Sequence, residues 1–168
     1  TGWRMTVRLA IALALLAVLG AAPGSARAQE FSQAVEAFDR GDHESAWFMF
    51  WELAQKGDSL SQFNLGQMYR LGLGVPTDLV QSRRWYEAAA QQGHPRAQFS
   101  LGVFYEFGHG VSRDTARART WYQRAAAQNL DQAREALARL DAVPGSGRAG
   151  ANGRPGPTAP ATANPPAR

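Results

Sequence analysis

The residues of this chain that could do chemistry do not form a recognisable catalytic set. Its three histidines, His43, His94 and His109, show neither a His-Glu-x-x-His motif nor the spacing of a three-histidine metal site. The absence of cysteine excludes thiol nucleophiles, disulfides and cysteine-ligated metals. The only lysine, Lys56, does not lie three residues after a serine, as serine enzymes that recognise penicillin require. We therefore expect surface histidines, no enzymatic activity, no metal and no cofactor.

Two further patterns have simple structural explanations. Glu44 and Glu52 lie eight residues apart on one predicted helix, about 12 Å at about 1.5 Å per residue. We interpret them as part of a solvated acidic face. The Gly72-x-Gly74 sequence follows a predicted helix rather than a strand and lacks a Gly-Lys-Ser/Thr ending, so it is not a phosphate-binding loop.

A cluster of aromatic residues is the strongest candidate for a binding site. Trp47, Phe48, Phe50 and Trp51 lie within five positions of each other on one predicted helix. A helix cannot bury four such neighbours unless other elements cover it on both sides. Either the flanking helices cover the whole cluster, or Trp47, Phe48 and Trp51 stay partly exposed and dock a partner. A glycan stacking on Trp47 and Trp51 is an alternative ligand.

The elements that position these residues repeat with a period of 36. When residues 57–92 are placed on residues 93–128, 16 of the 36 positions are identical. A fixed period in the thirties is the signature of a solenoid built from helix pairs. The in-phase signature is Leu65, Gly66, Tyr69, Gly72, Gly74, Asp78 and Trp85, matched by Leu101, Gly102, Tyr105, Gly108, Gly110, Asp114 and Trp121.

Each repeat is predicted to form two antiparallel helices. In the first repeat, Asp58 is a good N-cap for a helix from about Ser59 to Leu71, and Asp78 is a good N-cap for the second helix. Gly66 costs this helix about 1 kcal/mol relative to alanine, so its recurrence indicates a closely packed neighbour. We expect Trp85 and its equivalent Trp121 in the core.

Partial repeats flank the two full ones. Residues 31–56 form a degenerate first unit, whose turn Arg40-Gly41-Asp42 lacks the two-glycine loop. Residues 130–141 resemble the first helix of an incomplete unit and are predicted to cap the C-terminal end. The predicted fold class is therefore all-α, an α/α superhelix that occupies residues 29–142.

The two ends of the chain differ in composition from this domain. Residues 1–28 contain a 14-residue apolar run followed by Ala26-x-Ala28, which is typical of a secretory signal cleaved near Ala28 and Gln29. Residues 143–168 hold six prolines, five glycines and six alanines, with no acid and no aromatic, and we expect a disordered tail. Its arginines could bring the protein close to the cell wall.

The charge of the central domain argues against nucleic acid as a partner. The whole chain carries a net charge of +4, but residues 29–142 hold 12 basic and 14 acidic side chains. The domain therefore has a net charge of −2, the whole basic excess lies in the two terminal segments, and the domain lacks the basic surface that nucleic acids require.

The repeated motif resembles the Sel-one-like repeat (SLR), a relative of the tetratricopeptide repeat. The resemblance rests on Leu-Gly-x-x-Tyr-x-x-Gly-x-Gly-Val-x-x-Asp, six residues, then Trp-Tyr-x-x-Ala-Ala-x-Gln, found twice in phase. It implies an α/α superhelix that binds other proteins. Without cysteines, the chain differs from the disulfide-rich branch of that family, some of whose members have been linked to β-lactam binding.

Taken together, these observations predict a non-catalytic adaptor or assembly factor, located in the bacterial periplasm or outside the cell. Its partner would be a protein or peptide, and the mature chain would have no membrane span. Peptide-binding solenoids use their concave face, and positions that vary in phase are candidates for it: Asn64, Gln67, Arg70, Ser100, Val103, Glu106 and Phe107. A peptidoglycan- or glycan-binding module, or an envelope enzyme acting on peptidoglycan or β-lactams, are the alternatives.

Overall fold

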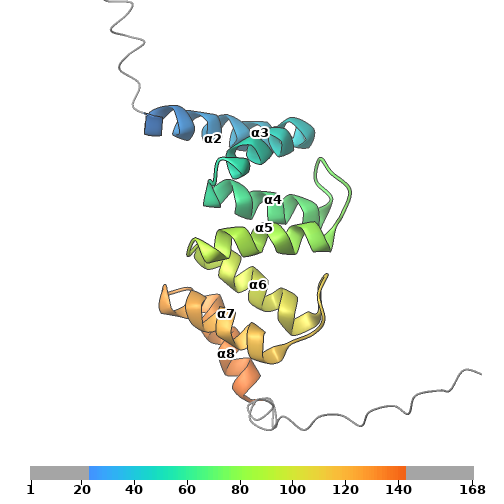
Figure 1. The fold of residues 1–168 in the computed structure, drawn as a ribbon, viewed down its shortest axis with the longest axis vertical. Helices are drawn as coiled ribbons and strands as arrows, with labels where there is room; N and C mark the ends of the chain where they lie inside the picture. The colour runs from blue at the N-terminus through green and yellow to red at the C-terminus, as the bar shows by residue number, and fades with distance from the viewer. Residues whose placement is uncertain (1–22, 143–168) are drawn as a thin grey trace, which may run out of the picture.

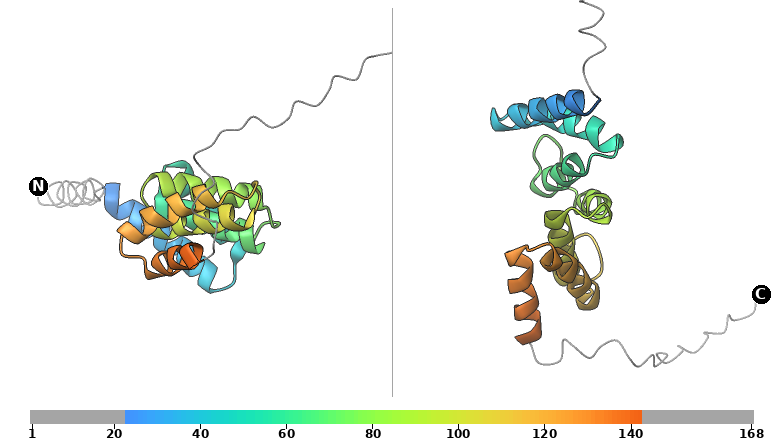
Figure 2. Two further views of the ribbon diagram at one scale, coloured as in Figure 1. Left: turned by 90° about the horizontal axis from the view of Figure 1, so that it is seen from below. Right: turned by 90° about the vertical axis from the view of Figure 1, so that its left-hand side faces the viewer.

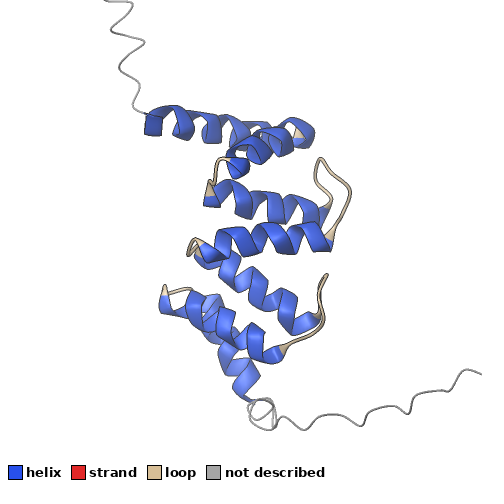
Figure 3. Ribbon diagram, in the orientation of Figure 1, coloured by secondary structure: helices blue, strands red, loops and turns tan. Residues whose placement is uncertain are grey.

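The computed structural model of the chain describes residues 23–142, which form seven α-helices and no strands (Figures 1 and 3). The predicted apolar run, most of the predicted signal and the predicted tail lie outside these residues. The helices are α2 (Pro23–Asp39), α3 (His43–Gln55), α4 (Ser59–Leu71), α5 (Leu79–Gln91), α6 (Pro95–Phe107), α7 (Thr115–Ala127) and α8 (Asp131–Ala142). The predicted all-α class is confirmed.

The helices are stacked in chain order as an α/α superhelix. Extensive contacts join each helix to the next one along the chain, from α2·α3 to α7·α8. Seen from the side, α2, α4, α6 and α8 lie along one side of the stack, and α3, α5 and α7 lie along the other (Figure 2). We call these two sides the first-helix layer and the second-helix layer.

Helix α2 begins before the predicted signal cleavage site. Residues 24–30 are all exposed, and within residues 24–39 Phe31 is the first to pack against the hydrophobic core, with its ring 5.7 Å from the Phe50 ring. The buried positions Ala34 and Ala37 follow. The segment before Gln29 therefore adds little to the core.

Side-chain caps set the starts of the helices, as the sequence predicts. The carboxylate of Asp58 accepts a hydrogen bond from the Ser61 backbone N–H at 2.7 Å, and that of Asp78 accepts from Val80 and Gln81. At the other end of α4, Gly72 adopts a left-handed conformation with φ of 72°. Such caps satisfy backbone groups that a helix end leaves unpaired.

The mid-helix glycines allow an aromatic ring to approach the helix closely. A Cβ at Gly66 would lie 2.5 Å from the Tyr86 ring, and a Cβ at Gly102 would lie 2.5 Å from the Tyr122 ring. The hydroxyl of Ser82 donates to the Gly66 carbonyl at 2.7 Å, which joins α5 to α4 at the same point. The predicted close neighbour is thus a tyrosine ring.

The two-glycine loops pack each repeat on the preceding unit. A Cβ at Gly74 would lie 2.1 Å from the His43 carbonyl oxygen, and a Cβ at Gly110 would lie 2.7 Å from the backbone of Leu79. Both contacts are with backbone at the start of a second-layer helix, so a side chain has no room there. The loops fix the spacing between successive units.

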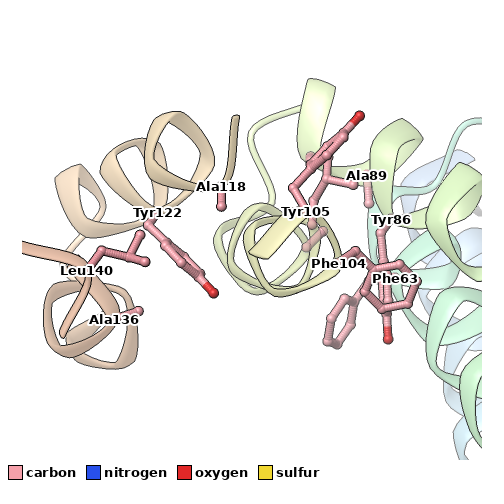
Figure 4. Packing of buried hydrophobic residues seen from close by; sticks show 12 residues of the cluster. Phe63, Tyr86, Ala89, Phe104, Tyr105, Ala118, Tyr122, Ala136 and Leu140 are labelled. Atoms are coloured by element: carbon pink, nitrogen blue, oxygen red, sulfur yellow. The ribbon is translucent and has the colours of Figure 1, made fainter. Parts of the chain in front are cut away.

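The core differs from the prediction in its central aromatic residues. Tyr86 and Tyr122 are fully buried, whereas Trp85 and Trp121 are only partly buried and pack at the edge of the core. Tyr86 contacts Phe63 and Phe104, and Tyr122 lies with Ala118, Ala136 and Leu140 (Figure 4). The prediction that the tryptophans form the core was therefore wrong. Adjacent helix positions point about 100° apart, and the tyrosines have the inward direction.

Candidate protein-binding surfaces

The first-helix layer contains a hollow of ≈ 180 Å³ between α2 and α4. Its lining is mostly apolar, with two amides: Val35, Phe38, Phe50, Asn64, Gln67, Leu71 and Leu73. Asn64, Gln67 and Leu71 follow one face of α4 at helical spacing, and the side chain of Leu71 is 50% exposed. The structure thus brings the predicted positions Asn64 and Gln67 together at one concave site.

The second repeat carries a similar strip on α6. Ser100 and Val103 are half-buried, and Phe107 is 58% exposed at the C-terminal end of the helix. The Phe107 ring lies 5.9 Å from the His109 ring, nearly parallel to it. Leu71 and Phe107 occupy equivalent positions, so each full repeat exposes one large apolar side chain there.

Glu106 is a structural residue and does not belong to a binding surface. It is buried, accepts a hydrogen bond from the Tyr122 hydroxyl at 2.6 Å and pairs with Arg139 of α8 at 2.9 Å. Burial and the Glu106 carboxylate both raise the pKa of Tyr122. The prediction for Glu106 was wrong. Equivalent positions of two repeats can carry different residues because each residue has a different partner inside its own repeat, and not only because they face a ligand.

Arg70, the equivalent residue in the first repeat, is exposed but has a similar internal role. It lies close enough to the hydroxyl of Tyr86 to oppose the increase that burial causes in the pKa of that tyrosine. Arg70 therefore belongs to the surroundings of a buried tyrosine as well as to the surface.

The aromatic cluster on α3 is divided between the core and the surface. Phe50 is buried, and Trp47 is half-buried against Tyr69, with ring centroids 6.3 Å apart. Phe48 is 53% exposed and Trp51 is 38% exposed. Neighbouring helices therefore cover one half of the cluster and leave the other half at the surface, so the simpler prediction that they cover all of it was wrong.

A second hollow, of ≈ 300 Å³, lies beside this exposed half, between α2 and α3. Its lining combines apolar and charged side chains: Glu30, Gln33, Phe48, Met49, Glu52, Leu53 and Lys56. Lys56 and Glu30 form an exposed ion pair across it at 3.2 Å. This hollow lies at the N-terminal end of the stack, apart from the residues of the first one.

The histidines occupy three different environments. His109 is exposed, whereas His43 and His94 are partly buried. His94 caps α6, since its Nδ1 accepts the Ala97 backbone N–H at 3.1 Å, and its ring stacks on Phe63. Burial lowers the pKa of His94. The expectation of a surface residue was wrong for His43 and His94. His94 has the capping role that Asp58 has 36 residues earlier.

Within residues 23–142 no three histidine, aspartate or glutamate side chains are grouped so as to hold a metal ion. Over the same range, no helix combines the length and the apolar character needed to cross a bilayer.

Sequence reasoning missed a ladder of glutamines that joins the repeats. Gln62 and Gln98 are buried, and each donates to a carbonyl of the preceding helix, that of Ala54 or Ala90, at 3.2 Å. Gln92 and Gln128 then donate to the Gln62 and Gln98 side chains at 2.7 and 2.8 Å. The signal was present in the sequence, because both pairs of glutamines are identical in phase.

The family comparison matches two copies of the Sel1 repeat, at residues 59–94 and 95–130. Among solved structures, the chain is similar to a Sel1 repeat protein from Oxalobacter formigenes, with 32% identity and a TM-score of 0.62 over 64% of this chain and 44% of that one. A protective antigen present in uropathogenic Escherichia coli strains, which displays an SLR fold, is 33% identical with a TM-score of 0.65 over 70% of this chain. The chain covers 26% of that antigen.

The cysteine-rich protein B of Helicobacter pylori shares the fold at 16% identity, with a TM-score of 0.55 over 70% of this chain and 99% of that one. No curated protein matches the chain significantly. The chain thus spans less than half the length of the two more similar structures.

Proposed function

We propose that this protein is a non-catalytic adaptor, because residues 59–94 and 95–130 are two Sel1 repeats and this kind of repeat generally mediates protein–protein interaction. The adaptor would bind a peptide segment of a partner protein on its first-helix layer. The observation that carries the proposal is the hollow between α2 and α4. It joins an apolar floor to the half-buried amides of Asn64 and Gln67.

The chemistry of this hollow suits a short peptide. An apolar side chain of the partner would bury itself against Phe38 and Leu71, while the amides of Asn64 and Gln67 can both donate to and accept from its backbone. Val103 and Phe107 extend the apolar strip along α6, so a longer segment could continue across both repeats.

The proposed cellular context is the bacterial envelope. It rests on the apolar run and the Ala26-x-Ala28 site of residues 1–28. A mature chain starting at Gln29 would keep every side chain that lines the hollow.

Affinity capture with a matched pair of variants tests the adaptor function. Leu71 and Val80 are both aliphatic and similarly exposed, at 50% and 43%, but only Leu71 lines the hollow. We expect the tagged full chain and V80E to recover the same one or two proteins from the native envelope fraction. L71E should recover at least about tenfold less, because a buried unpaired carboxylate opposes binding. Equal recovery by L71E, with all three proteins folded by circular dichroism, would contradict the proposal.

A further inference from the structure

The exposed half of the aromatic cluster forms a surface of distinct chemistry, which we call the aromatic–acidic surface: Phe48, Trp51, Glu44 and Glu52. The Phe48 and Trp51 rings lie 6.4 Å apart and within 24° of parallel. Glu44 and Glu52 lie one turn before and about one turn after Phe48 on the same side of α3. Rings of this kind give a flat apolar contact area between two carboxylates.

The charge of this region favours a basic ligand. Residues 29–58 hold seven acidic and two basic side chains, a net charge of −5, whereas residues 59–142 hold seven acidic and ten basic ones, a net charge of +3. Neither Glu44 nor Glu52 has an ion-pair partner among residues 23–142. A ligand with arginines would therefore gain attraction without displacing an existing ion pair.

The neighbouring hollow favours small apolar rings. Its lining includes the apolar side chains of Phe48, Met49 and Leu53, together with Glu52. Phe48 is the one aromatic residue among the residues that line it, and the Trp51 ring lies beside the Phe48 ring. Proline-rich segments bind aromatic surfaces because their polyproline II conformation is largely formed before binding. Arginine in such a segment can also lie over an indole ring or pair with a carboxylate.

Residues 143–168 of the chain have this composition. They contain six prolines and three arginines, Arg148, Arg154 and Arg168, with no acidic residue, and Pro155 follows Arg154 directly. We propose that the aromatic–acidic surface binds the arginine- and proline-containing segment 148–160 of a second copy of this chain, and thereby links copies head to tail.

A second copy fits better than the same copy because of where the segment begins. It follows α8, which lies at the opposite end of the stack from α3 (Figure 1). The path between them crosses five helix-to-helix steps of about 8–10 Å each. Arg154 lies 12 residues beyond Ala142, the last residue of α8, and 12 fully extended residues span at most about 43 Å. Binding of this arginine within one copy would therefore require near-full extension of the connecting residues, whereas binding between copies does not.

The absence of cysteine allows a direct test with the full chain. Ala151→Cys provides one labelling position between Arg148 and Arg154, and a bimane dye attached there is quenched when it contacts a tryptophan. We expect quenching that increases with protein concentration over the micromolar to submillimolar range. The W51L variant should lose most of this quenching, since Trp51 is the exposed indole of the surface.

A matched pair of charge variants gives the second readout. E44Q/E52Q removes the two unpaired carboxylates and should raise the concentration of half-maximal quenching about threefold or more, and added salt should do the same. E135Q replaces an exposed acid of α8 that has no ion pair among residues 23–142, and it should leave this concentration unchanged. These substitutions are at exposed positions and should leave the fold intact. Circular dichroism would check that each variant keeps the helix content of the unmodified chain.

Two outcomes would overturn the proposal. Quenching that does not depend on concentration would mean that the segment contacts its own domain. Quenching that W51L leaves unchanged would mean that the segment does not meet this surface. Neither outcome bears on the hollow of the first-helix layer, because the two sites share no residue.

Discussion

At the scale of the residue, in-phase positions of the two repeats share a location but not always a chemistry. His94 caps α6 where Asp58 caps α4, and Glu106 stands where Arg70 does, near a buried tyrosine hydroxyl. In each exchange the side chain still hydrogen-bonds at the same place in the repeat, but the charge of that side chain differs. At the start of α6, the exchange introduces a histidine whose pKa is lowered by burial.

His94 should make stability fall on mild acidification. Burial, together with Arg96, lowers the pKa of His94 in the folded chain below the usual 6.5. The unfolded chain thus binds this proton more readily, so stability is retained above about pH 6.5 and is lost as the pH falls through that value. H94N keeps an uncharged cap, and denaturant titrations from pH 7 to pH 5 should show a smaller loss of stability than in the unmodified chain.

The exposed His109 provides the control for this effect. H109N should have the pH dependence of the unmodified chain. A loss of stability between pH 7 and pH 5 that is identical in H94N and the unmodified chain would show that the cap does not titrate.

Gly66 should not tolerate a methyl group, although alanine favours helices by about 1 kcal/mol. Its Cβ would lie 2.5 Å from the Tyr86 ring, which Phe63 and Phe104 hold in place. We expect G66A to lower the free energy of unfolding by about 1–3 kcal/mol. Q67A, one residue along α4, should change it by less than about 0.5 kcal/mol. A G66A variant as stable as Q67A would mean that the tyrosine ring moves aside easily.

At the scale of the element, the repeat allowed the helices to be predicted closely. The expected helix from Ser59 to Leu71 has the same bounds in the structure, because an aspartate cap and a left-handed glycine mark its two ends. The central aromatic residue could not be identified in this way. Trp85 and Tyr86 are adjacent and recur together, so the period does not distinguish which one points inward.

The ion pair between Arg139 and Glu106 should stabilise the packing of α8 on the rest of the superhelix. Arg139 donates to both carboxylate oxygens of Glu106, at 3.1 and 2.9 Å. R139M keeps the aliphatic stem but leaves a buried carboxylate without its ion pair. We expect a loss of about 1–3 kcal/mol and faster hydrogen exchange in α8.

Arg134 is the matched control on the same helix, since it pairs with Asp131 at the surface. R134M should cost less than about 1 kcal/mol, because exposed ion pairs contribute little. If the amides of α8 undergo hydrogen exchange at the same rate in R139M and R134M, the ion pair between Arg139 and Glu106 does not anchor this helix.

At the scale of the molecule, the superhelix and its repeats could be derived from the period of 36, but its binding surfaces could not. Asn64 and Gln67 were candidates because they vary in phase, and they line a hollow only because α2 lies beside α4. Residues 31–56 carry little of the repeat motif, so the contribution of α2 to that hollow depends on packing that the sequence pattern does not encode.

Photocrosslinking at Gln67 is the most direct test of the first-helix layer as the binding surface. A photoreactive amino acid at Gln67 would lie in the hollow, and one at Gln81, a half-buried glutamine of α5, would lie in the second-helix layer. In living cells we expect a specific crosslinked partner from position 67 and none from position 81. A partner crosslinked from position 81 alone would contradict the account and place recognition on the second-helix layer.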